Sequence, residues 1–433
     1  MTIFGAVQLA PPKLSFSKDV PSHTGPDAWK GLNLYGPFDN TRVALEEKSV
    51  LFVFPKPLIE QARKLARGLE GRKGFRGVEK MFRIPFNGKM MDNLAFDANL
   101  SSPLAAAASY REAIQNWNAT RTTNPLVALV LIPRSDRWET SRPYYEAKAA
   151  FAQLGIPTQM VTTELLENDS QFDWSIANIA LQMFAKLGGI PWLIEVPPGD
   201  DDLIIGIGRA EVRKGSGRKR VFGYALSFAS NGYYRSAWVF KPVATEEEYE
   251  KCLREAVAGS LRRSIAEMDQ SPRRLVLHLG KRTGHKEVEA VEAAMKDVGV
   301  TLPTAFLRID DSSNYDLTSG TDTFAPPKGL AVHLGPRRVL LQADGLSQLG
   351  PPEGPLLIEL NERSTVGLDE LDELVAQAFR LGNANWRGFN ARSRPMTLVY
   401  GEILAGLVGY LEEVESWNPD LLQSVIRERP WFL

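Results

Sequence analysis

The stretch SVLFVFPKPLIEQARKLARGLEG, residues 49–71, sets the fold class of this 433-residue chain. Its first seven residues form a continuous apolar run, which is typical of a buried strand, and the residues after it repeat their apolar positions at helical spacing. The same alternation continues with a strand at 125–133, a helix at 142–155, a strand at 158–164 and a helix at 175–187. Residues 91–119 are expected to be partly helical. Strands that alternate with helices predict a parallel, Rossmann-like sheet over residues 46–192.

The pattern changes after residue 197. LIIGIGRAEV at 203–212, RVFGYALSF at 220–228 and GYYRSAWVF at 232–240 follow one another as three expected antiparallel strands. A long amphipathic helix at 244–269, a strand at 273–280, a helix from residue 286 and a strand at 304–310 come next. This order predicts an α/β, RNase H-like domain for residues 193–433. Residues 1–45 are too few for a domain and are expected to add strands to the other two.

Composition narrows the class of protein. The chain is 44% hydrophobic and 24% charged, which is typical of globular domains with buried cores. Cys252 is the only cysteine, so an intramolecular disulfide and a thiolate zinc site are excluded. The apolar runs are too short to cross a membrane and no signal peptide is evident, so we expect a cytoplasmic protein without membrane contact. A net charge of −1 argues against a protein that binds nucleic acid everywhere on its surface, because such proteins carry a broad excess of basic residues. It remains compatible with a localised basic channel.

Four residues form a spaced set in the first domain. Tyr144 and Lys148 lie in RPYYEAK, Gln159 follows in GIPTQ, and Lys186 lies in NIALQMFAKLGG. Taken singly, each has an ordinary interpretation: a half-buried tyrosine, a solvated lysine, a glutamine at the start of a strand, and a lysine that favours a helix C-terminus. Together, and in these surrounding sequences, the set resembles the MID domain of Argonaute proteins.

The resemblance implies a pocket for the 5′-phosphorylated end of a guide strand. Tyr144 and Lys148 are four residues apart and share one helix face, so the ring can stack on the terminal base while the ammonium group meets the phosphate. Gln159 and Lys186 would add donors to the phosphate oxygens. The chain ends in PWFL, and the Leu433 carboxylate, with Gln159, is expected to hold Mg²⁺ beside the guide phosphate; a buried apolar tail is the alternative.

Basic residues of the second domain are the expected contacts to the nucleic-acid backbone. The segment NWRGFNARSRPMTLVY, residues 385–400, resembles the PIWI segment that lies near the guide. Arg387, Arg392 and Arg394 belong to this segment, and Lys281 and Arg282 follow the strand at 273–280. All five residues are expected to contact backbone phosphates.

The same resemblance predicts a PIWI domain that cannot cut. Active PIWI domains hold metal ions with clustered carboxylates, because a two-metal mechanism activates water and stabilises the leaving oxygen. Gly208 stands where the first aspartate is expected, Gly280 or Leu279 where the second is expected, and only Glu402 is present near the last position. Displaced ligands, Asp201 and Asp202, are the alternative. The four histidines lack metal-ligand spacing, and GIGRAE at 206–211 fails the dinucleotide fingerprint.

The resulting prediction is a short prokaryotic Argonaute of MID and PIWI domains. By resemblance it would bind a guide RNA, recognise complementary single-stranded DNA, and activate a partner chain in defence against plasmids or phages. That partner would carry an APAZ region joined to a TIR or sirtuin-like NAD-consuming domain, or to a nuclease. Two alternatives remain at this point: a guide-directed, metal-dependent endonuclease with a non-standard site, and a Rossmann nucleotide-binding protein without guides.

Overall fold

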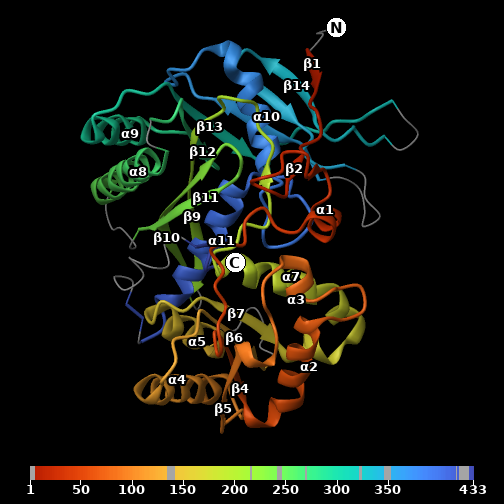
Figure 1. Ribbon diagram of the computed structural model, residues 1–433. Coiled ribbons are helices and arrows are strands. Elements are labelled where there is room, and N and C mark those ends of the chain that lie inside the picture. Colours follow the sequence, from red (N-terminus) through yellow and green to blue (C-terminus); the bar gives the residue numbers. More distant parts are fainter. Residues whose placement is uncertain are drawn as a thin grey trace.

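The computed structural model describes residues 5–133, 142–214, 217–240, 246–268, 271–320, 324–345, 353–415, 417–418 and 429–433. Two lobes stand one above the other in Figure 1. The lower lobe contains mainly residues from the first half of the chain, and the upper lobe contains mainly residues from the second half. Among the described residues, no helix is both long enough and apolar enough to cross a membrane.

The lower lobe is built on a parallel four-stranded sheet with the order β5-β4-β6-β7. Its strands are β4 (Val50–Pro55), β5 (Met91–Phe96), β6 (Val127–Ile132) and β7 (Thr158–Thr162). Its helices are α2 (Ile59–Glu70), α3 (Val78–Phe82), α4 (Pro103–Thr120), α5 (Arg142–Gln153), α6 (Thr163–Glu167) and α7 (Asp169–Lys186). The expected Rossmann-like sheet is therefore confirmed.

Helices cover both faces of this sheet, which explains why its central strands are apolar at every position. In β4, Phe52 faces the core shared with α2 and α7, whereas Val53 faces a second core shared with α4 and α5. Successive side chains of a strand point to opposite faces, so a strand covered on both sides has no polar position. All six residues of β4 and all six of β6 are buried.

The upper lobe contains a mixed nine-stranded sheet with the order β1-β14-β15-β16-β13-β12-β9-β10-β11. Its strands are β1 (Ala6–Gln8), β9 (Leu203–Lys214), β10 (Gly217–Ala229), β11 (Tyr234–Val239), β12 (Leu275–Leu279), β13 (Thr304–Asp310), β14 (Leu330–Gly335), β15 (Arg338–Leu341) and β16 (Leu356–Leu360). The strands β9, β10 and β11 are antiparallel neighbours, and β9, β12 and β13 run parallel. This is the expected mixed α/β order, extended by β14 to β16.

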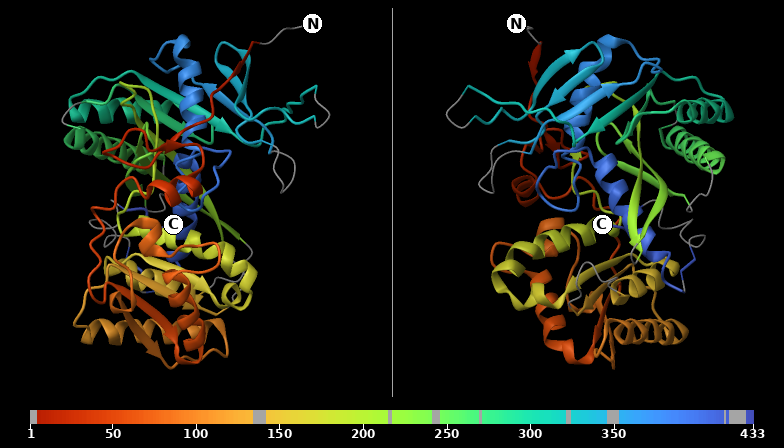
Figure 2. Two further views of the ribbon diagram at one scale, coloured as in Figure 1. Left: turned by 45° about the vertical axis from the view of Figure 1, so that its right-hand side comes forward. Right: turned by 180° about the vertical axis from the view of Figure 1, so that it is seen from behind.

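Two pairs of helices enclose the nine-stranded sheet. The helices α8 (Glu246–Met268) and α9 (His285–Val298) form a hydrophobic core with one face, and α10 (Leu371–Leu381) and α11 (Met396–Leu411) pack on the other. The helices α8 and α9 lie side by side in both views of Figure 2. The short 3₁₀ helices are Lys56–Leu58, Gly88–Met90 and Leu368–Glu370.

The N-terminal segment adds strands to the upper lobe and its border. The strand β1 pairs with β14 at the edge of the large sheet. The strands β2 (Leu14–Ser15) and β3 (Thr24–Gly25) form a small sheet with β8 (Leu193–Ile194), and α1 (Ala28–Tyr35) follows them.

Two elements differ from the sequence expectation. Residues 91–96 form the edge strand β5, with alternating exposure, before α4 begins at Pro103. The helix α7 begins at Asp169, six residues before the expected start, because the Asn168 side chain caps it by accepting a hydrogen bond from the backbone of Gln171.

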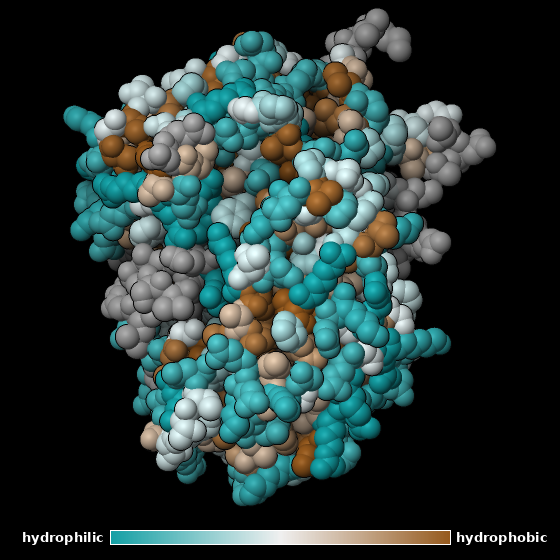
Figure 3. Space-filling view, in the orientation of Figure 1, coloured by the Kyte–Doolittle hydropathy of each residue, from teal (hydrophilic) through white to brown (hydrophobic). Residues whose placement is uncertain are grey.

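The two lobes share one hydrophobic core. The helix α11 packs against β9 and β10 and also contacts α5 of the lower lobe. The C-terminus lies at the junction of the lobes in all views (Figures 1 and 2). There Trp431 and Phe432 are buried in the cluster that continues from α7 to the upper sheet. The face drawn in Figure 3 is mostly hydrophilic, with hydrophobic residues gathered near its middle, at the level of this junction.

Candidate nucleic-acid interface

Lys148 lies in the interior, where the lower lobe meets the C-terminal tail. It is 1% exposed, and its Nζ lies 3.3 Å from the carbonyl oxygen of Thr158 and 3.3 Å from that of Trp431. The rings of Tyr144 and Trp431 lie 6.0 and 5.8 Å from the same Nζ. Burial lowers the pKa of Lys148 to about 7, and the positive charge of Arg387 adds to this shift. The solvated surface lysine of the ordinary interpretation is therefore wrong.

Lys186 is fully buried at the end of α7 and reaches the same region from the other side. Its Nζ donates to the side-chain oxygen of Gln159 at 2.5 Å. Burial lowers the pKa of Lys186 well below its ordinary value, and the charges of Lys148 and Arg387 act in the same direction. The structure thus brings Lys148, Gln159 and Lys186 together, although 38 residues separate the two lysines in sequence.

Neither lysine has an acidic partner among the described residues. The groups that contact the two ammonium nitrogens are backbone carbonyls, an amide oxygen and aromatic rings, and no carboxylate forms an ion pair with either. Two unpaired buried ammonium groups are costly, because desolvation penalises the charged form. A dianionic ligand that enters between them would restore their charge, so this arrangement suits a phosphate monoester.

Tyr144 lies beside the lysines. Its ring is half-buried and packs edge-on against Tyr145 at a centroid distance of 5.0 Å. Burial raises the pKa of Tyr144, so its hydroxyl stays protonated and can donate a hydrogen bond. Arg387 is exposed, and Gln182 of α7 donates to its carbonyl oxygen at 2.9 Å, which places this arginine at the mouth of the same region.

The two expected metal ligands are oxygen donors of the type that Mg²⁺ prefers. Leu433 is 7% exposed and lies two residues after Trp431, whose carbonyl contacts Lys148. The side-chain oxygen of Gln159 accepts a hydrogen bond from Lys186. Because Mg²⁺ usually completes its shell with phosphate oxygens and water, this donor set fits a cation that arrives together with a phosphorylated ligand.

Gly208 and Gly280 stand where catalytic aspartates were expected, and both lie near the carboxyl ends of the parallel strands β9 and β12. At Gly208, the side chain of Tyr224 occupies the space that an aspartate side chain would need. A Cβ atom placed on Gly208 would lie 2.0 Å from the hydroxyl oxygen of Tyr224. Tyr224 faces Gly208 across β9 and β10, where the register shifts between Val221 and Tyr224, and its hydroxyl lies 3.4 Å from the carbonyl oxygen of Leu398. An aspartate at position 208 therefore needs Tyr224 to move.

The remaining carboxylates near this edge are paired with an arginine. Both oxygens of Glu402 accept hydrogen bonds from Arg394, at 2.7 and 2.5 Å, and Asp311 lies 3.2 Å from the Arg394 Nε. The guanidinium group thus lies between these two carboxylates and pairs with both. Gly280 has open space around it, and the following Lys281 is paired with Glu287. Sequence reasoning did not find Asp311, because its partner lies 83 residues away.

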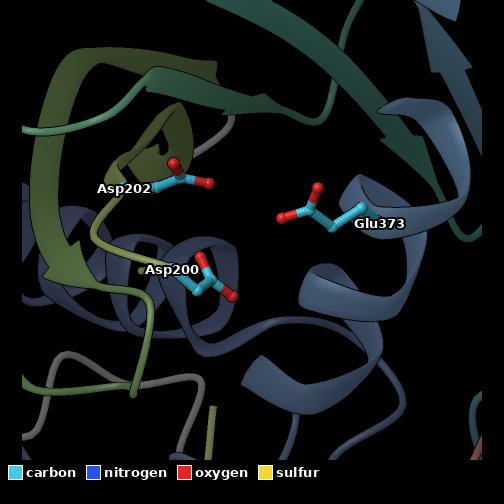
Figure 4. A group of neighbouring side chains, drawn as sticks. All are labelled: Asp200, Asp202 and Glu373. Atoms are coloured by element: carbon cyan, nitrogen blue, oxygen red, sulfur yellow. The ribbon is translucent and has the colours of Figure 1, made fainter. Parts of the chain in front are cut away.

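An acidic cluster occurs at the opposite edge of the sheet. Asp200, Asp202 and Glu373 have carboxylate oxygens within 4.8 Å of one another and point toward a common centre (Figure 4). Asp202 precedes β9, so about six strand residues, roughly 20 Å, separate it from Gly208. The cluster therefore lies far from the expected catalytic edge.

Arginines already neutralise this cluster. Arg274, which is 1% exposed, contacts Asp202 at 2.5 Å and Glu373 at 2.9 Å, and Arg380 contacts Asp200 at 2.8 Å. Each of the three carboxylates is thus paired with an arginine, of which Arg274 is buried and Arg380 is half-buried. The network joins the start of β9 to β12 and α10. The displaced-ligand alternative through Asp202 thus gains no support from this geometry.

The other expected backbone contacts are exposed. Arg392 lies between α10 and α11, and Arg282 follows β12 at the rim of a cavity of about 340 Å³ that Arg308, Arg337 and Arg338 also line. Of the five basic residues expected to contact backbone phosphates, Arg394 and Lys281 are engaged in ion pairs, whereas Arg387, Arg392 and Arg282 are exposed.

Comparison with known proteins agrees with this arrangement. The Piwi domain family model matches residues 129–307, which span both lobes. The Protein argonaute of Cereibacter sphaeroides is 28% identical over 451 residues, which cover 94% of this chain and 56% of that protein. The Piwi protein of Archaeoglobus fulgidus is 27% identical, with 68% of this chain and 73% of that protein covered. The chain thus spans about half the length of the first relative.

Solved structures show the same fold. Clostridium butyricum Argonaute, bound to a guide DNA with a 5′ deoxycytidine and a 19-mer target DNA, superposes with a TM-score of 0.73 at 19% identity, covering 94% of this chain and 53% of that chain. Drosophila Piwi superposes with a TM-score of 0.69 at 18% identity, covering 99% and 56%. The domain model, the relatives and the solved structures thus agree that the chain is similar to Argonaute and Piwi proteins in sequence and in the fold of both lobes.

Proposed function

We propose that this protein binds the 5′-phosphorylated end of a guide strand in the pocket of Tyr144, Lys148, Gln159 and Lys186. The observation that carries the proposal is the pair of buried lysines without a carboxylate partner among the described residues. A folded protein retains such a destabilising pair where a ligand supplies the missing negative charge. A phosphate monoester fits because it brings two charges and several acceptor oxygens to one point.

Similarity to Argonautes supports the proposed guide and target. The Argonaute of Clostridium butyricum was solved with a guide DNA and a target DNA, which supports a similar pairing of strands here. We propose an RNA guide and a complementary single-stranded DNA target, with base pairing supplying sequence specificity while the protein contacts the backbone. Arg387, Arg392 and Arg282 are the exposed residues proposed for these backbone contacts.

Magnesium is proposed at the 5′ phosphate. Gln159 and the Leu433 carboxylate would hold it, and the ion would neutralise part of the phosphate charge when bound. Lys186, which donates to the Gln159 side-chain oxygen in this structure, would supply a second positive charge to the phosphate.

We further propose that the protein does not cut its target. Tyr224 fills the space at Gly208, and Arg394 occupies the carboxylates of Glu402 and Asp311, so two metal ions lack a ligand set at this edge. The output would come from a partner chain with an APAZ region and a TIR, sirtuin-like or nuclease domain, acting in defence against plasmids or phages. Loss of NAD⁺, or cutting of bystander DNA, after target addition to the two co-purified chains would support this. No response to the target would contradict it.

Binding of 5′-phosphorylated RNA of about twenty nucleotides, compared with its 5′-hydroxyl twin, tests the pocket. We expect a large preference for the phosphate, which the double variant Lys148→Ala, Lys186→Ala should abolish, while the surface variant Lys80→Ala should retain it. A DNA strand of the same sequence tests the choice of guide. Complementary single-stranded DNA added with Mn²⁺ should be retained uncut; a cut opposite the middle of the guide would instead support the endonuclease alternative.

A further inference from the structure

A cavity of about 340 Å³ lies on the upper sheet beside the start of α9, and we call it the arginine cavity. Four arginines from three segments line it: Arg282 in the loop before α9, Arg308 in β13, and Arg337 and Arg338 at the turn between β14 and β15. A water molecule takes up roughly 30 Å³ of liquid water, so the cavity has room for roughly ten water-sized groups. This volume is at the lower end of the range for small-molecule pockets, about 300–1,000 Å³.

The arginine cavity lies on the face of the sheet that α8 and α9 cover. In β13, Leu307 and Ile309 belong to the core shared with α10 and α11, whereas Phe306 belongs to the core shared with α8 and α9. Because side chains alternate along a strand, Arg308 points to the same face as Phe306. The helix α11, which contacts α5 of the lower lobe, packs on the opposite face. The sheet therefore separates the arginine cavity from the junction where the proposed guide pocket lies.

Positive charge dominates the wall of the cavity. Glu359 of β16 accepts a hydrogen bond from Arg308 at one carboxylate oxygen, and the Nε of Arg338 lies 3.8 Å from the other. Arg337 donates to a backbone carbonyl oxygen at 3.2 Å, and neither Arg337 nor Arg282 forms an ion pair with a described carboxylate. The lining thus has four guanidinium groups and two glutamates, of which Glu359 is already paired. This excess of positive charge suits an anion.

Two donors that belong to lining residues have no hydrogen-bond partner. The Nε of Arg308 and the hydroxyl of Thr283 are buried atoms, and neither meets an acceptor among the described residues. Folded proteins pair nearly all of their buried donors, so two unpaired donors at one cavity indicate a ligand that brings acceptors. Phosphate oxygens are acceptors of this kind, and guanidinium groups pair with them through two parallel hydrogen bonds.

We propose that the arginine cavity binds a small anion with two or more linked phosphate groups. Several guanidinium groups can each meet a different phosphate of such a ligand, whereas a single phosphate ion would fill only about half of the cavity. No aromatic ring among the described residues lines the cavity, so the wall offers no surface on which a nucleobase could stack. Recognition is therefore confined to the phosphates, which can come from inorganic polyphosphate or from the tail of a nucleotide. The site is independent of the proposed guide binding.

Calorimetric titration of the full chain with small anions tests the proposal. The background is the double variant Lys148→Met, Lys186→Met, because the two buried lysines are proposed to bind phosphate as well. The probes are inorganic phosphate, pyrophosphate, triphosphate, AMP and ATP, at equal ionic strength and without magnesium. Pyrophosphate and triphosphate should bind this background at a single site, and inorganic phosphate and AMP at least roughly ten-fold more weakly. ATP that binds as tightly as triphosphate would identify a nucleotide as the source of the phosphates, and weaker binding of ATP would identify inorganic polyphosphate.

Substitutions in the wall then locate the bound anion. Addition of Arg337→Gln and Arg338→Gln to the background should weaken pyrophosphate binding by roughly ten-fold per guanidinium. Thr283→Val removes only a hydroxyl group and should weaken binding several-fold without a change in charge. Arg282 is kept, because it is also proposed to contact the nucleic-acid backbone. The exposed Arg363→Gln, just beyond the lining, is the matched control and should bind like the background. Equal thermal melting of the free variants checks folding.

Four results would overturn the inference. The first is no binding of pyrophosphate or triphosphate to the background, which would leave the guide-binding proposal untouched. The second is equal affinity for inorganic phosphate, because the cavity would then hold any single anion. The third is an equal loss in Arg363→Gln, since the general positive charge of this surface would then attract the anion. The fourth is displacement of pyrophosphate by a 5′-hydroxyl single strand, which would assign the cavity to the path of the nucleic acid.

Discussion

The buried position of Lys148 should make the proposed guide binding depend on pH in a predictable direction. In the free protein its pKa is about 7, so half of the molecules carry a neutral lysine at pH 7 and most do so at pH 8.5. A phosphate in the pocket restores the charge, so binding takes up a proton above pH 7 and affinity falls as pH rises. The phosphate is already dianionic above pH 7, because its second pKa is about 6. Its own titration therefore does not change the binding affinity in this pH range.

The magnitude follows from the fraction of charged lysine. Between pH 7 and pH 8.5 that fraction drops roughly fifteen-fold, so Lys148 alone should weaken guide binding roughly fifteen-fold over this range. Lys186, whose pKa burial also lowers, acts in the same direction. The variant Lys148→Met keeps the length and apolar stem of the side chain. It should remove the part of the pH dependence of affinity that Lys148 causes. The double variant with Lys186→Met should bind without pH dependence.

Filter binding of 5′-phosphorylated and 5′-hydroxyl strands at four pH values, in buffers of equal ionic strength, measures the effect. The surface variant Lys80→Met should behave like the wild-type protein. A phosphorylated strand that binds equally well at pH 7 and 8.5 would refute the reasoning, because the lysines would then not change charge on binding. The same slope for the hydroxyl-ended strand would refute it too, since the proton would belong to another group.

Four further results are expected. Lys148→Met should stabilise the free protein by up to about 5 kcal/mol below pH 7. At that pH the wild-type lysine is protonated in both the folded and the unfolded protein, and only the folded protein removes the charge from water. The stabilisation should shrink as pH rises toward 10.5, and urea unfolding at several pH values measures it. Arg274→Ala should cost about 3–5 kcal/mol by leaving buried carboxylates unpaired, again measured by urea unfolding, with the 5′-phosphate preference of the folded protein unchanged. Gly208→Asp should cost about 1–3 kcal/mol through its clash with Tyr224, and Tyr224→Ala in the same chain should recover part of it in thermal melting. Arg394→Ala should let Glu402 and Asp311 bind Mn²⁺ in calorimetric titration without restoring cleavage; no gain in Mn²⁺ binding would show that the arginine does not substitute for a cation.

The regular elements were predictable because burial leaves a pattern in the sequence. The central strands β4 and β6 are covered on both faces, which forces an unbroken apolar run. The set of Tyr144, Lys148, Gln159 and Lys186 was singled out by its resemblance to the MID domain of Argonautes, and only the four-residue spacing of Tyr144 and Lys148 follows from a helix face. The edge strand β5 was missed because exposed positions interrupt its apolar pattern.

Contacts between distant segments were not predictable. Amphipathic periodicity places Lys148 on a solvated face, and its burial depends on a tail 283 residues away. Nothing near Gly208 indicates that Tyr224, across a register shift, fills its space. The ion pairs of Arg394 with Asp311 and Glu402 were likewise not predictable, because the packed fold fixes which side chains become partners.

The hydrophobic cluster that runs through both lobes has a consequence for how the protein melts. Trp431 and Phe432 belong to the same cluster as α7 below and α11 above, so apolar packing continues across the junction of the lobes, beside the core that each lobe has to itself. Calorimetry should therefore record one cooperative transition instead of two. Separately expressed halves would each expose the apolar surface that the other normally covers, and they should precipitate alone and recover solubility when refolded together.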